Sequence, residues 1–194
     1  MEFLKRWKRY PKTKRLFTKV MLKPAVSDKD HFQGAKSATI VLVEYGDYQC
    51  PHCGRAYPIL KKIQKQLGDE LKFVFRNFPI EESHPDAVQA AIASEAAALQ
   101  NKYWEMHDAL FEHQNDLSEN GILSLAKNLK LDLKKFSADW QSEELSQKVE
   151  DDFESGVRSG VNGTPGFFIN GQAYYDNWEY EYFLNYLKGL LQVR

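Results

Sequence analysis

The feature that most constrains this chain is its pair of cysteines, Cys50 and Cys53, the only two in 194 residues. Residues 40–45 before the pair are apolar and β-branched and predict a buried strand, whereas residues 56–67 after it have the apolar spacing of a helix. Cys50 then falls at a helix N-terminus, where unpaired N–H groups and the helix dipole favour a thiolate. We therefore predict an acidic, solvent-accessible Cys50 and a shielded Cys53, with His52 between them as an added donor or charge.

Three interpretations of the pair compete. A zinc site needs about four ligands, and the chain has no third cysteine. His107 and His113 have the spacing of a zinc-finger pair, but they lie far along the chain and would point to different faces of one helix. Two buried structural thiols would explain Cys53 better than Cys50. We therefore predict a redox pair with no metal and no other cofactor, since two cysteines at this spacing beside a β-α-β pattern are typical of redox motifs.

Length and composition bound the fold class and the expected location. A chain of 194 residues with 43% hydrophobic and 13% aromatic content is long and apolar enough for one substantial core. It has no apolar run near the roughly 20 residues of a membrane span, and its N-terminus lacks the apolar segment of a secretory signal. We therefore expect a cytoplasmic protein. In a reducing cytosol, two lone cysteines favour catalysis over a structural disulfide.

Charge is segregated along the chain. Nine basic residues and one acidic residue lie between Met1 and Pro24, which leaves the remainder acidic. The apolar side chains Phe3, Leu4 and Trp7 could form one stripe of a basic amphipathic helix that touches an anionic membrane surface or a protein partner. The alternative is a solvated extension without a partner. We expect no nucleic-acid partner.

The order of the elements predicts a domain inside a domain. A second strand is expected over residues 71–78, parallel to the first because right-handed crossovers connect parallel strands. Helical patterns fill the middle of the chain, and Asn170-Gly171 predicts a hairpin turn before a closing amphipathic helix. We predict an α/β architecture in three parts: an extension and linker over 1–34, a βαβ…ββα domain over 35–80 and 161–194, and an inserted all-helical domain over 81–160.

Several residues at fixed distances from the pair agree with one family. Glu44 lies six residues before Cys50, Pro58 lies eight after it, and Thr164-Pro165 directly precedes the hairpin. Together with the order of elements, they make residues 35–191 resemble the DsbA-like branch of the thioredoxin superfamily, whose thioredoxin fold carries a helical insertion. Two further segments support the resemblance: Asn77-Phe78-Pro79 and His84-Pro85.

The resemblance implies an activity and roles for the site residues. It implies protein thiol–disulfide exchange through Cys50 and Cys53 in the oxidising direction, with protein substrates and an unidentified electron donor or acceptor. Glu44 would be a buried acid that exchanges a proton with Cys53, although a strand-end carboxylate could also face solvent. Thr164 and a cis Pro165 would hold the substrate, whereas an ordinary turn proline would be trans. The alternatives are a kappa-class glutathione transferase, which lacks the paired cysteines, and a redox sensor or binding module that docks through its basic N-terminus.

Overall fold

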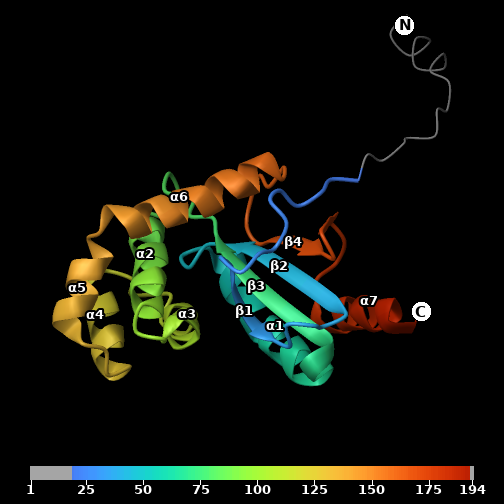
Figure 1. Ribbon diagram of the computed structural model, residues 1–194, viewed down its shortest axis with the longest axis horizontal. Helices are drawn as coiled ribbons and strands as arrows, with labels where there is room; N and C mark the ends of the chain where they lie inside the picture. Colours follow the sequence, from blue (N-terminus) through green and yellow to red (C-terminus); the bar gives the residue numbers. More distant parts are fainter. Residues whose placement is uncertain (1–18, 193–194) are drawn as a thin grey trace, which may run out of the picture.

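A five-stranded mixed sheet forms the centre of the protein, which a computed structural model describes over residues 19–192 (Figure 1). The strands are β1 (His31–Gly34), β2 (Ile40–Gly46), β3 (Leu71–Asn77), β4 (Gly166–Ile169) and β5 (Gln172–Tyr174). They lie in the order β1-β3-β2-β4-β5, and only β2 and β3 are parallel. The predicted β-α-β unit and the later hairpin therefore share one sheet.

The N-terminal part of the chain contributes more to the sheet than the sequence indicated. We interpreted residues up to 34 as extension and linker, but residues 31–34 form β1 and pair with β3 along one edge. At the opposite edge Met21 bridges to Gln172 of β5. The linker interpretation is thus wrong for these segments, because backbone hydrogen bonds attach them to the two edges of the sheet. A polar sequence does not reveal such pairing. The predicted amphipathic stripe falls within residues 1–18, outside the described residues.

Helices cover both faces of the sheet, and successive side chains along β2 point alternately to one face and to the other. The helices α1 (Pro51–Leu67) and α7 (Tyr180–Gln192) lie on one face, and α6 (Glu143–Arg158) runs along the other side (Figure 1). Leu42 belongs to the core cluster beneath α1 and α7, and Val43 to the cluster on the other face. Glu44, one further along, returns to the α1 face.

The middle of the chain is helical, as predicted. Its helices are α2 (Ala87–Ala98), α3 (Tyr103–Glu112), α4 (Glu119–Asn128), α5 (Leu133–Trp140) and the long α6, and a short 3₁₀ turn, η3 (Gly68–Glu70), ends α1. The side chains of Asp132 and Ser142 cap α5 and α6 by accepting N–H groups of the first turn. None of the helices within residues 19–192 combines the length and apolarity that crossing a bilayer requires.

A buried polar network joins the helical block to the sheet. The Asn77 amide at the end of β3 donates to Glu95 of α2 at 3.0 Å, and the Asn77 backbone N–H donates to Asp152 of α6 at 3.2 Å. Lys148 forms an ion pair with Asp152 at 2.7 Å, and His31 of β1 contacts the second oxygen of Glu95 at 2.8 Å. Each of these elements is thereby fixed relative to the end of β3.

Candidate active site

Cys50 is the N-cap of α1, so the loop after β2 delivers it to the carboxyl end of the sheet. Its backbone is extended (φ −70°, ψ 122°), and its carbonyl accepts the first helical N–H, from Gly54, at 3.0 Å. The side chain is less accessible than predicted: Cys50 is only 4% exposed. The loop before β4 covers it, with the Thr164 carbonyl oxygen 3.5 Å from its Sγ. The expectation of a freely exposed nucleophile is therefore wrong.

The surroundings of Cys50 favour its thiolate. The Cys53 thiol, which can donate to the Cys50 sulfur, is the largest of the influences that lower the pKa of Cys50 to about 5. Hydrogen bonding from the Thr164 side chain and from the backbone N–H groups of Cys53 and His52 lowers this pKa further, against the opposing effect of burial. His52 itself is exposed on the first turn of α1. At neutral pH the Cys50 side chain is an anion.

Cys53 has the opposite character. It lies one helical turn further along α1, on the stripe that faces the sheet, and it is completely buried. Burial raises its pKa well above the ordinary value, and the neighbouring Cys50 and Glu44 raise it further. The two thiols thus divide into an anionic sulfur and a protonated one.

Glu44 lies below the pair, where the alternation of β2 directs its side chain into the core. It is 2% exposed, and its Oε1 has no hydrogen-bond partner among the described residues. Burial, reinforced by the negative charge of Cys50, raises the pKa of Glu44 to about 8. The carboxyl group is thus largely protonated at neutral pH and able to exchange a proton.

The loop before β4 reaches Cys50 because of how β4 pairs with β2. Gly166, the first residue of β4, lies opposite Tyr45 near the end of β2, so the preceding residues pass over the start of α1. The Thr164–Pro165 peptide bond is cis. The Thr164 hydroxyl on this loop is buried. The loop therefore presents backbone and side-chain polar groups beside the Cys50 sulfur.

Asp47, which directly follows β2, is a further site residue that no motif in the sequence singled out. One carboxylate oxygen accepts the backbone N–H groups of Gln49 at 2.7 Å and Cys50 at 3.1 Å. The other accepts the N–H of Ile80 at 2.8 Å and lies 2.7 Å from Nδ1 of His84, which belongs to the His84-Pro85 segment of the resemblance. Asp47 thus shapes the cysteine loop, and its bond with the N–H of Gln49, two residues further on, is that of an Asx turn.

Gln114, after α3, holds the same loop from the helical block. Its side-chain amide donates to the carbonyl of Tyr48 at 2.7 Å and to that of Cys50 at 2.8 Å. The fit depends on Gly54, because a Cβ there would lie 2.3 Å from the Gln114 side-chain oxygen. No local pattern reveals this contact, since 64 residues separate Gln114 from Cys50.

Comparison with known sequences gives a family and an unexpected set of relatives. A family model described as Thioredoxin matches residues 26–189. The Na⁺/H⁺ antiporter NhaA 1 of Mycolicibacterium vanbaalenii is 41% identical over 161 residues, which are 82% of this chain and 26% of the antiporter. The NhaA antiporter of Herminiimonas arsenicoxydans is 37% identical over 154 residues, which are 79% of this chain and 24% of that protein. The chain thus spans about a quarter of the length of these curated relatives.

These relatives overturn the expected cytoplasmic location. In them the matching region belongs to an ion antiporter, a protein that works in a membrane. The expectation failed because it was argued from the lack of an apolar span, and a domain carried by a membrane protein needs no span of its own.

The solved structures agree with the fold. A thioredoxin-like oxidoreductase from Silicibacter pomeroyi superposes with a TM-score of 0.77 at 24% identity, covering 87% of this chain and 95% of that one. Oxidised BdbD from Bacillus subtilis gives 0.74 at 26% identity, with 84% and 93% covered. Wolbachia pipientis alpha-DsbA1 gives 0.74 at 22%, with 86% and 93% covered. The predicted fold class is confirmed: the chain belongs to the thioredoxin family and has the fold of the DsbA-like thiol–disulfide oxidoreductases.

Proposed function

We propose that this protein oxidises protein thiols by exchanging disulfides through Cys50 and Cys53. The observation that carries the proposal is the position of the Cys50 sulfur, 3.5 Å from the Thr164 carbonyl oxygen in the loop before β4. A substrate strand that pairs with this loop would bring its own sulfur to Cys50, as strand addition does. Ion transport is not part of the proposal, because the match covers only about a quarter of each antiporter.

The exchange begins with the pair joined as a disulfide. A substrate thiolate attacks the Cys50 Sγ, so that a substrate–Cys50 bond forms while the Cys50–Cys53 bond breaks. Cys53 leaves as a thiolate and takes a proton from Glu44, whose carboxyl is largely protonated at neutral pH. A second substrate thiolate then attacks the substrate sulfur of the mixed disulfide and releases Cys50 as a thiolate. The substrate has lost two electrons, which the reduced pair passes to an unidentified acceptor.

The low pKa of Cys50 supports the oxidising direction. At pH 7 a thiol with a pKa of about 5, compared with an ordinary 9.0, makes the reduced form more favourable by about 2.7 kcal/mol. For a two-electron couple this energy corresponds to about 60 mV. We therefore expect a reduction potential above the roughly −270 mV of thioredoxin. A potential at or below that value, measured by equilibration with glutathione, would refute the direction.

The proposal is tested by oxidation of a reduced, unfolded model protein with glutathione disulfide as the final oxidant. The wild-type chain should accelerate disulfide formation, and Cys50→Ser should abolish the acceleration. Cys53→Ser should also lose most of the acceleration, because the Cys50–Cys53 disulfide that the substrate thiolate attacks cannot form. If the wild type gives no turnover above Cys50→Ser, the chain is a redox sensor or binding module and not a catalyst.

A further inference from the structure

A groove of about 480 Å³ lies between the loop that follows β3 and α6, next to the Cys50 site. One wall includes Asn162, only two residues before Thr164 and therefore within about 7 Å of it along the chain. The other wall includes Ile80, whose backbone N–H is bound to the carboxylate of Asp47 that also accepts the Cys50 N–H. Both walls are thus continuous with the residues that surround the reactive sulfur.

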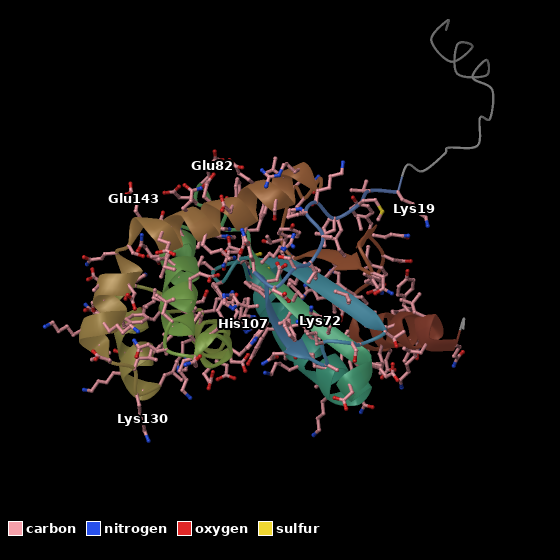
Figure 2. The ribbon with its side chains drawn as sticks, in the orientation of Figure 1. Lys19, Lys72, Glu82, His107, Lys130 and Glu143 are labelled. Carbon is pink, nitrogen blue, oxygen red and sulfur yellow. The ribbon has the colours of Figure 1, made fainter. Side chains whose placement is uncertain are left out.

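The lining of this groove is apolar at its base and anionic at its rim. The apolar side chains come from the end of β3, from α2 and from α6: Phe78, Val88, Val149 and Phe153. The carboxylates of Glu81, Glu82 and Glu150 are exposed at the rim, and Figure 2 shows Glu82 projecting to the outside beside α6. We call this surface the acidic groove.

The rim carboxylates are not neutralised by the fold. Within residues 19–192, Glu81, Glu82 and Glu150 have no hydrogen bond or ion pair from a side chain, and no lysine or arginine lines the acidic groove. The basic residues of α6 are already engaged: Lys148 pairs with Asp152, and Arg158 with Glu154. The groove therefore carries an uncompensated negative charge over an apolar base, which suits a ligand that is apolar in the middle and cationic on both sides.

We propose that the acidic groove binds the segment of a protein substrate next to its reactive cysteine, where an apolar side chain is flanked by lysine or arginine. The proposal rests on the proposed function, because the substrate reaches the groove by pairing with the loop that contains Thr164. An extended chain advances about 3.3 Å per residue, so the groove is reached by positions about three to six residues from the cysteine in contact with Cys50.

Paired peptides test the proposal. Each contains one cysteine pair and either Lys-Leu-Lys or Glu-Leu-Glu, placed about three to six residues to the N- or C-terminal side of the reacting cysteine. The measured quantity is kcat/KM for oxidation by the full chain. Exposed charge pairs contribute little individually, so the two lysines together should favour the basic peptide over the acidic one by about tenfold in one placement. The preference should shrink at high salt.

Two variants with the same change of net charge show whether the preference for the basic peptide comes from the acidic groove or from the rest of the surface. The groove variant is Glu81→Gln, Glu82→Gln and Glu150→Gln, and the control replaces three exposed acids elsewhere, Asp69→Asn, Glu70→Gln and Glu181→Gln. The groove variant should lose the preference for the basic peptide, and the control should keep it. Oxidation of a short uncharged dithiol should be the same in both, which shows that the Cys50 site is intact.

Each other outcome overturns the proposal in a distinguishable way. Equal rates for both peptides, with normal turnover of the uncharged dithiol, would reject the groove but leave the proposed function standing. Loss of the preference in both variants would show steering by net charge alone. No turnover of any dithiol would reject the proposed function itself.

Discussion

Replacing Glu44 with glutamine should stabilise the protein, and the gain should depend on pH. The pKa of Glu44 is about 8 in the fold and about 4.5 in the unfolded chain, so the native state holds a proton that the unfolded chain releases. Stability from this group is fully present below about pH 4.5 and is lost as pH rises through 8. At pH 7 the loss relative to pH 4 is at most about 3 kcal/mol.

Glutamine keeps the shape of the side chain and cannot ionise, so Glu44→Gln should avoid this loss. We expect it to exceed the wild type by about 3 kcal/mol at pH 7 and to match it near pH 4. For a chain of this length that difference raises Tm by about 6 to 12 °C. Glu70→Gln, an exposed change of the same kind, provides the control. Denaturant unfolding at several pH values gives the comparison.

The redox state supplies a second check on Glu44. The negative Cys50 contributes to the raised pKa, and that charge disappears when the disulfide forms. The stability difference at pH 7 should therefore be smaller for the oxidised proteins than for the reduced ones. In exchange assays the variant should be slower at the step in which Cys53 leaves. A difference in stability that is independent of pH, or a less stable variant, would refute a protonated Glu44.

Three further changes test the geometry of the site and the core. Cys53→Ala should raise the pKa of Cys50 towards its ordinary value, because the largest influence that lowers it is removed; an unchanged ultraviolet thiolate titration would assign the effect to the helix N-terminus. Gln114→Ala should cost about 1 to 2 kcal/mol and speed alkylation of Cys50, since two hydrogen bonds to the loop are lost; an unchanged alkylation rate would contradict a role in holding the loop. Gly156→Ala should cost about 1 to 3 kcal/mol in thermal unfolding, because its Cβ would lie 2.5 Å from a phenylalanine ring. In the control Gly189→Ala the new Cβ meets nothing within 4 Å, so equal losses would contradict the packing argument.

Local signals in the sequence predicted most of the fold. The middle of the chain is helical as its pattern indicated, and Asn170 and Gly171 both have positive φ in the hairpin turn that their dipeptide indicated. The sequence failed where pairing is between distant backbones. β1 has no strong strand pattern, and its position follows from the edge that β3 offers.

In the candidate site, too, the features set by local sequence were predictable and those set by contacts between distant segments were not. The contrast between Cys50 and Cys53 follows from helix position, and the period of the strand places Glu44 in the core. The cover over Cys50 was not predictable, because it depends on the register of β4 against β2. Asp47 could not be singled out for a different reason: an aspartate after a strand is common, and only its hydrogen-bond partners distinguish this one.

The polar network at the end of β3 limits how the two halves of the molecule can move. If the helical block slid by one residue along the sheet, the Asn77 amide and the carboxylates of Glu95 and Asp152 would face one another out of reach and away from water. Buried polar groups without partners cost about 1 to 3 kcal/mol each, so intermediate positions are unfavourable. Any hinge opening that admits a large substrate should therefore be all-or-none at this junction. The chain runs from this junction through α6 to the loop that contains Thr164. Opening of the junction and a change in the shape of that loop would therefore occur as one event.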